Sequence, residues 1–178
     1  MSQQVTVTYL EMKSPGGLRR KAMPDGARVE MVPQPTPERN REFYVEVGGE
    51  YAWTDRLPWS RERWLEYLEQ PGVETWILTF NGQRAGYFEL APQPDGSIDL
   101  AYFGLLRDFT GQGLGGALLT FATERAWQKG ACTVTVNTCT LDHPAALQHY
   151  LARGFQIART VTRDETTPPS NGDRSTAE

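Results

Sequence analysis

Alternation of apolar and polar residues predicts several strands in this chain. Residues 5–12, VTVTYLEM, alternate as a half-buried strand does, and residues 27–32, ARVEMV, form a second, shorter one. Within residues 74–91, two apolar runs flank Asn81-Gly82, the strongest short-range signal for a hairpin. Three further segments rich in β-branched or aromatic residues are predicted as strands: 97–106, 131–141 and 155–163.

Apolar residues at helical spacing predict four helices between these strands. Thr36 and Ser60 can cap the first two and Asp142 the fourth, because such side chains accept hydrogen bonds from first-turn N–H groups. The predicted helices cover residues 36–51, 60–70, 115–130 and 142–154.

The order of elements is therefore β-β-α-α-β-β-β-α-β-α-β, an α/β (α+β) fold. The helix over 115–130 connects strands 97–106 and 131–141, which makes these two strands parallel neighbours. We expect one domain over residues 1–163. Residues 164–178 contain almost no apolar side chains, so a disordered C-terminal tail is expected there.

Four glycines stand in the stretch DFTGQGLGGALL, residues 108–119, after the strand 97–106. Three of them satisfy G-x-G-x-x-G, but a dinucleotide site also needs an acid about 20 residues further on, where Val136 and Asn137 stand. No Lys-Ser or Lys-Thr follows, which excludes a P-loop. A pyrophosphate-sized anion on the N–H groups of residues 111–116 remains, with a turn that merely permits tight packing as the alternative.

Two motifs together resemble the GNAT superfamily of N-acetyltransferases. IDLAYFGLLRDFTGQGLGGALL, residues 98–119, is similar to the family's strand, loop and helix that bind the pyrophosphate of coenzyme A. HPAALQHYLARGF, residues 143–155, is similar to the later helix and turn beside the pantetheine arm. The resemblance implies a mixed, mostly antiparallel sheet with about four helices and a splayed parallel strand pair at the coenzyme site. It also implies an acetyl-CoA-dependent N-acetyltransferase without a metal, with a non-catalytic acyl-CoA-binding domain as the alternative.

The resemblance further implies which residues bind acetyl-CoA. The N–H of Leu105 would bind the thioester carbonyl with Leu106 beside it, and His143 would contact the coenzyme arm. The family usually has Arg or Gln where this chain has Thr110, whose hydroxyl can still cap the helix and donate to phosphate. The loop residues implied in pyrophosphate binding are Thr110, Gly111, Gln112, Gly113, Leu114, Gly115 and Gly116.

Tyr150 matches the family tyrosine beside the coenzyme sulfur and is the candidate general acid, although it also completes an apolar helix face. Glu89 and Asp99 lie on adjacent predicted strands and are expected to face each other, as a candidate general base. Alternatively, either carboxylate lies on the solvated face of its strand, and the proton passes along water. Cys139 is expected to be a small buried hydrophobe rather than a nucleophile.

Charge and cysteine content limit the remaining possibilities. The net charge of −4 argues against a nucleic-acid partner, and no signal peptide or membrane span is predicted, so a cytoplasmic protein is expected. Cys132 and Cys139 are predicted on opposite faces of one strand, unable to pair. His143 and His149 are predicted on different faces, without metal-ligand spacing. The aromatic segment 51–59 is either a packed cap or a pocket wall for an unidentified amine acceptor. Acidic residues in and before it, Glu46, Glu50 and Asp55, either attract a cationic amine or are simply solvated. A monomer or homodimer is expected.

Overall fold

The computed structural model describes residues 3–49, 51 and 53–164, so most of the predicted C-terminal tail lies outside the described residues. The predicted order of strands and helices is confirmed, with two short 3₁₀ turns added. The strands are β1 (Gln4–Met12), β2 (Ala27–Met31), β3 (Glu74–Phe80), β4 (Gln83–Pro92), β5 (Ile98–Leu105), β6 (Val134–Cys139) and β7 (Gln156–Asp164). The helices are α1 (Pro37–Gly48), α2 (Arg61–Leu68), α3 (Leu114–Gln128) and α4 (Ala146–Ala152).

The strands form one seven-stranded sheet in the order β2-β3-β4-β5-β6-β1-β7. Strands β5 and β6 are parallel, and the other neighbouring strands are antiparallel. The parallel pair is short: its register couples Ile98 with Val134 and Asp99 with Thr135. Beyond Asp99 the two strands diverge, which confirms the expected mixed sheet with a splayed parallel pair.

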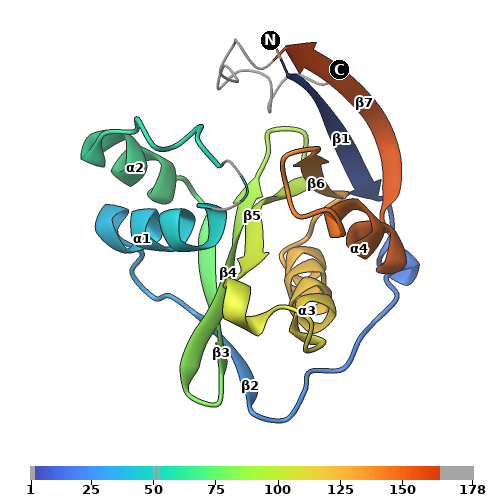
Figure 1. The fold of residues 1–178 in the computed structure, drawn as a ribbon, viewed down its shortest axis with the longest axis horizontal. Helices are drawn as coiled ribbons and strands as arrows, with labels where there is room; N and C mark the ends of the chain where they lie inside the picture. The colour runs from blue at the N-terminus through green and yellow to red at the C-terminus, as the bar shows by residue number, and fades with distance from the viewer. Residues whose placement is uncertain (1–2, 50, 52, 165–178) are drawn as a thin grey trace.

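Helices cover both faces of the sheet, α1 and α2 on one side and α3 and α4 on the other (Figure 1). Each side has its own apolar core. The core under α1 and α2 contains Phe43, Tyr44, Val47, Trp64, Tyr87 and Tyr102. The larger core under α3 and α4 includes Leu78, Phe88, Leu100, Leu118 and Tyr150. Of the helices in the described part of the chain, none has the length and hydropathy that a membrane crossing requires.

Local sequence signals account for most of the turns and helix starts. The side chain of Thr36 accepts from Arg39 N at 3.3 Å and that of Ser60 from Arg63 N at 3.2 Å, so both predicted caps are confirmed. The β3–β4 turn has φ of 51° at Asn81, a conformation that asparagine tolerates better than most residues.

Two predictions about the segment around β6 are wrong. Asp142 does not cap α4, which begins at Ala146; its carboxylate instead accepts from the Thr138 hydroxyl and the Cys139 N–H, closing the end of β6. The two cysteines do not share a strand, because Cys132 precedes β6 and Cys139 ends it. Both are free thiols.

Glu74 ties β3 to α3 through charged hydrogen bonds. Its Oε1 accepts from Arg125 Nη2 at 2.6 Å and from Lys129 Nζ at 2.9 Å. Burial alone would raise the pKa of Glu74, but hydrogen bonds from Arg125 and Lys129 outweigh it and lower the pKa to about 2. The native state therefore favours the ionised carboxylate more strongly than the unfolded chain does.

We expect Glu74 to make the protein acid-sensitive. Its contribution is present above the unfolded pKa near 4.5 and is lost as the pH falls toward 2. The free energies of unfolding of the wild type and Glu74→Gln, measured with urea, should differ by about 3 kcal/mol near pH 6 and converge only below about pH 2. The exposed Glu62→Gln is the control, and an undiminished difference at low pH would contradict the assignment.

Candidate active site

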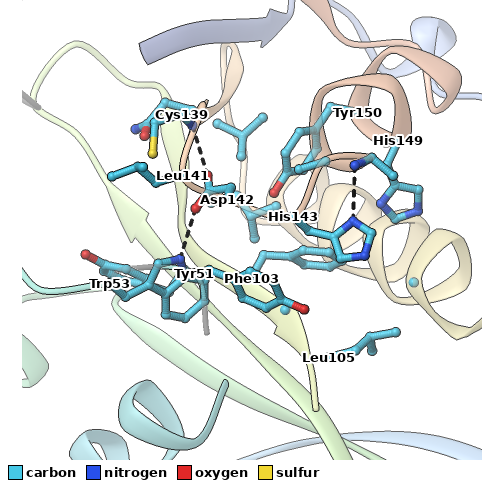
Figure 2. A pocket seen from close by; sticks show the side chains of 18 of the residues that line it. Tyr51, Trp53, Phe103, Leu105, Cys139, Leu141, Asp142, His143, His149 and Tyr150 are labelled. Carbon is cyan, nitrogen blue, oxygen red and sulfur yellow. Dashed lines mark hydrogen bonds between the residues drawn. The ribbon is translucent and has the colours of Figure 1, made fainter. Parts of the chain in front are cut away.

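A pocket of about 850 Å³ opens where β5 and β6 diverge. The β5 residues Leu100–Leu105 form one wall, and the end of β6 with α4 forms the opposite wall. One end is lined by residues before and at the start of α3: Thr110, Gly111, Gly113, Gly115 and Gly116. Figure 2 shows Tyr51 and Trp53 at one side of the pocket, with Tyr150 and His149 across from them. Segments distant in the sequence thus meet around one cavity.

The glycine loop exposes its backbone to this pocket. Gly111 and Gly113 have φ of 78° and 79°, left-handed values that other residues adopt only with strain. Gly113 is the N-cap of α3, so the unpaired N–H groups of the first helical turn lie at the pocket surface. Among the predicted loop residues, Thr110, Gly111, Gly113, Gly115 and Gly116 line the pocket.

Two other predicted loop residues turn away from the cavity. Leu114 is fully buried in the α3–α4 core. The Gln112 side chain donates to Asp108 O at 3.2 Å, within the loop itself. Their side chains stabilise the loop rather than face a ligand.

The end of β5 offers a backbone donor to the pocket. Leu106 N donates to Ala85 O at 2.8 Å, toward β4. Because successive residues of a strand direct their N–H groups to opposite edges, Leu105 directs its own toward the edge that β6 has left. Leu105 lines the pocket, whereas Leu106 packs against the α1–α2 core. Of the two predicted leucines, the geometry suits Leu105 as a hydrogen-bond donor to a ligand.

Tyr150 lies in the pocket wall and is 6% exposed. Its ring packs edge-on against Phe103 and Phe155, with centroids 6.2 and 6.1 Å away. Burial, followed by the negative charges of Asp142 and Asp99, raises the pKa of Tyr150 well above its ordinary value. The hydroxyl is therefore protonated near neutral pH and can donate a hydrogen bond, and the same side chain fills the core.

The family described as Acetyltransferase (GNAT) family matches residues 35–155. This stretch contains the splayed strand pair, the glycine loop and Tyr150. The chain belongs to the GNAT acetyltransferase family. No curated protein matches the sequence.

Solved structures share this GNAT fold. The GCN5-related N-acetyltransferase from Sphaerobacter thermophilus superposes with a TM-score of 0.70 at 16% identity, covering 92% of this chain and 53% of its own. The GCN5-related N-acetyltransferase from Kribbella flavida gives 0.66 at 21%, covering 91% and 58%. An aminoglycoside acetyltransferase from a soil metagenomic sample, solved with trehalose, gives 0.58 at 14%, covering 72% and 88%. The chain thus spans little more than half the length of the first two.

Thr110, which departs from the usual GNAT residue, is engaged within the protein. Its hydroxyl donates to Arg107 O at 2.8 Å, so the prediction that it caps α3 is wrong. The short 3₁₀ turn over Arg107–Phe109 comes between β5 and the loop and holds Thr110 away from the helix.

Lys21, which no sequence motif singled out, lies against the glycine loop. A Cβ built on Gly113 would lie 3.6 Å from Lys21 Nζ, and one built on Gly116 would lie 2.7 Å from Lys21 Cδ. The Lys21 backbone N–H donates to Thr120 Oγ1 on α3 at 3.0 Å, which fixes this segment over the helix. The basic run Arg19-Arg20-Lys21 was the signal available in the sequence.

The two histidines both line the pocket, so the prediction that they face different ways is wrong. Helical spacing does not apply to His143, because α4 starts three residues after it. Its Nδ1 accepts from Ala145 N at 3.1 Å. Burial, then the charges of Arg153 and Lys21, lowers the pKa of His149. Among the described residues, no cluster of three or more His, Cys, Asp or Glu side chains is arranged to hold a metal ion.

The two carboxylates predicted as a base do not oppose each other. The β4–β5 register couples Glu89 with Tyr102 and Asp99 with Ala91. Glu89 is 0% exposed and accepts from Arg56 Nη1 with both oxygens, at 3.0 and 3.2 Å, within the α1–α2 core. Asp99 accepts from the Thr135 hydroxyl at 2.8 Å, across the parallel pair. Each carboxylate therefore has a structural partner.

Cys139 also borders the pocket. Burial, then the Asp142 carboxylate, raises the pKa of its thiol. Since the thiolate is the nucleophilic form, this environment disfavours attack by Cys139.

Proposed function

We propose that this chain is an acetyl-CoA-dependent N-acetyltransferase that transfers the acetyl group directly to an amine. The observation that carries the proposal is the convergence of three features on one cavity. These are the first-turn N–H groups of α3, the N–H of Leu105 at the splayed edge of β5, and the Tyr150 hydroxyl.

Each feature suits one part of the cosubstrate. The N–H groups and positive dipole end of α3 suit the pyrophosphate, and the separated edges of β5 and β6 suit the pantetheine arm, whose amides need hydrogen-bond partners. The N–H of Leu105 would bind the thioester oxygen and stabilise the oxyanion of the tetrahedral intermediate.

Transfer then requires two proton movements. The amine nitrogen attacks the thioester carbon, the C–S bond breaks, and Tyr150 donates its proton to the leaving thiolate. The amine gives up its proton to water, since Glu89 and Asp99 each already bind a partner within the protein. Burial raises the pKa of Tyr150, so its hydroxyl holds a proton near neutral pH, and the tyrosinate left after transfer takes a proton back through water.

The first experiment is isothermal titration with acetyl-CoA, with NAD as the control. We expect saturable binding of acetyl-CoA and no heat with NAD. Tyr150→Phe should then bind acetyl-CoA as the wild type does while its rate of acetyl transfer falls by about 10²-fold. Equal rates in the two proteins would remove Tyr150 as the acid. Binding without transfer to any amine would favour the non-catalytic acyl-CoA-binding domain.

Lys21 should contribute to cosubstrate binding through its charge. Replacing it by glutamine removes the cation beside Gly113 and should raise the Kd for acetyl-CoA by about three- to tenfold at low ionic strength. The difference should shrink in high salt, because exposed charges are screened. Lys13→Gln, at an exposed ion pair with Glu11, is the matched control. An unchanged Kd at low salt would exclude the contact.

A further inference from the structure

The pocket has a second end, away from the glycine loop, whose wall contains Trp53. The indole packs against Gly48 and Gly104, where added Cβ atoms would lie 2.4 and 3.5 Å from the ring. It also packs edge-on against Tyr102, with centroids 4.8 Å apart, and Nε1 donates to Asp142 Oδ1 at 3.3 Å. Figure 2 shows this ring beside Tyr51, facing the cavity. The Trp53 side chain therefore forms part of the pocket wall, and contacts with Gly48, Tyr102 and Asp142 fix its position.

Asp55, two residues further along, brings a carboxylate to the same end. Its Oδ1 accepts from the Tyr44 hydroxyl at 2.7 Å and its Oδ2 from the Tyr102 hydroxyl. Burial, then Tyr102 and Asp55, raises the pKa of Tyr44 far above its ordinary value, so that hydroxyl remains a donor. Hydrogen bonds donated to a carboxylate favour its charged form. Two buried tyrosine hydroxyls thus hold the Asp55 carboxylate at the pocket wall.

Charge is divided along the cavity. Lys21 and the N–H groups of α3 make the glycine-loop end positive. At the other end, Asp55 and Asp142 line the wall, and Asp142 accepts from the Trp53 indole. These two carboxylates make this end negative. Such a cavity suits an anionic group at one end and a cationic group at the other.

We propose that the end of the pocket formed by Tyr51, Trp53 and Asp55 binds the acceptor, and that the acceptor is a primary ammonium on an aromatic or apolar body. A carboxylate beside aromatic rings attracts an ammonium through both its charge and the ring faces. The site adjoins the reacting centre, because Trp53 packs on Gly104, the residue before Leu105. This inference rests on the proposed acetyl transfer and adds the class of acceptor.

The reaction balances with these groups. The ammonium binds Asp55 and loses one proton to water, and its nitrogen forms the amide bond to the acetyl carbon. The C–S bond breaks, and coenzyme A leaves as the thiol with the proton from Tyr150. The second amine proton passes through water to restore the Tyr150 hydroxyl, so one proton is released overall. Asp55 acts here as a binding residue for the cation.

The test uses phenethylamine and tyramine as acceptors, with release of the coenzyme A thiol as the readout. Asp55→Asn retains an oxygen that accepts from a tyrosine but lacks the charge, so the KM for either amine should rise about tenfold or more. The KM for acetyl-CoA should stay within about twofold of wild type. Tyr51→Leu, which removes one ring, should raise the amine KM about threefold. Asp25→Asn, an exposed carboxylate in the loop before β2, is the matched control.

The neutral analogue 2-phenylethanol separates charge from shape. Its inhibition constant for the wild type should exceed the Kd of phenethylamine. The inhibition constant should be the same for Asp55→Asn as for the wild type. An unchanged amine KM in folded Asp55→Asn would overturn the acceptor site. So would acetyl-CoA binding without acetylation of either amine. Loss of acetyl-CoA binding in the wild type is a different result, because it would overturn the proposed function itself.

Discussion

Replacing Glu89 by glutamine is expected to lower the free energy of unfolding by about 3 to 5 kcal/mol. The substitution leaves the Arg56 guanidinium buried without its counter-charge. Arg56 is 4% exposed and lies over the rings of Trp59, Tyr67 and Tyr102 at 4.6, 4.2 and 4.3 Å. These rings attract the cation but do not neutralise it. Urea denaturation near neutral pH measures the loss.

Two comparisons make this result specific to the ion pair. Glu66→Gln, an exposed carboxylate on α2, should change the free energy of unfolding by less than about 0.5 kcal/mol. The double variant Arg56→Leu/Glu89→Leu should be more stable than Glu89→Gln, because apolar side chains replace both charges together. If Glu89 were also the general base, Glu89→Gln would lose acetyl transfer even under conditions where it remains folded.

Replacing Gly154 by alanine is expected to destabilise the protein by about 2 to 5 kcal/mol. Gly154 has φ of 106°, and an added Cβ would lie 1.9 Å from Gly17 O. The backbone of the Gly17 segment must therefore move. Arg19 N donates to Arg153 O at 2.8 Å in the same contact, so the displacement reaches the segment that carries Lys21.

Gly130→Ala separates backbone strain from collision. Gly130 has φ of 88°, but nothing lies within 4 Å of an added Cβ. That variant should therefore lose only about 1 to 2 kcal/mol. Gly154→Ala should also bind acetyl-CoA more weakly than Gly130→Ala does. Equal losses of stability in the two variants would contradict the close contact with Gly17.

The fold followed from the sequence wherever a signal is local. Alternation, the Asn81-Gly82 turn and the caps at Thr36 and Ser60 each depend on a few neighbouring residues. Asp142 has the sequence context of a cap as well. Its carboxylate instead accepts hydrogen bonds from Thr138, Cys139 and Trp53. Trp53 lies 89 residues earlier in the chain.

The same distinction explains the site. The glycine loop was predictable because the residues with left-handed backbone conformation, Gly111 and Gly113, are glycines. Lys21 reaches the pocket through tertiary contacts that no spacing encodes. Glu89 was a candidate catalytic carboxylate because it and Asp99 lie on adjacent strands and were expected to face each other. It instead forms a buried ion pair, and its partner Arg56 lies 33 residues away.

Asp142 joins the two ends of the pocket. One oxygen accepts from the indole of Trp53, and the other binds Thr138 and Cys139 at the end of β6, just before His143. A ligand that displaced the β6 end would therefore also act on Trp53 through Asp142, and the reverse is equally true. Under the proposed function, thermodynamic linkage would make any effect of acetyl-CoA on the Kd of the amine equal to the effect of the amine on the Kd of acetyl-CoA. Asp142 would transmit this coupling.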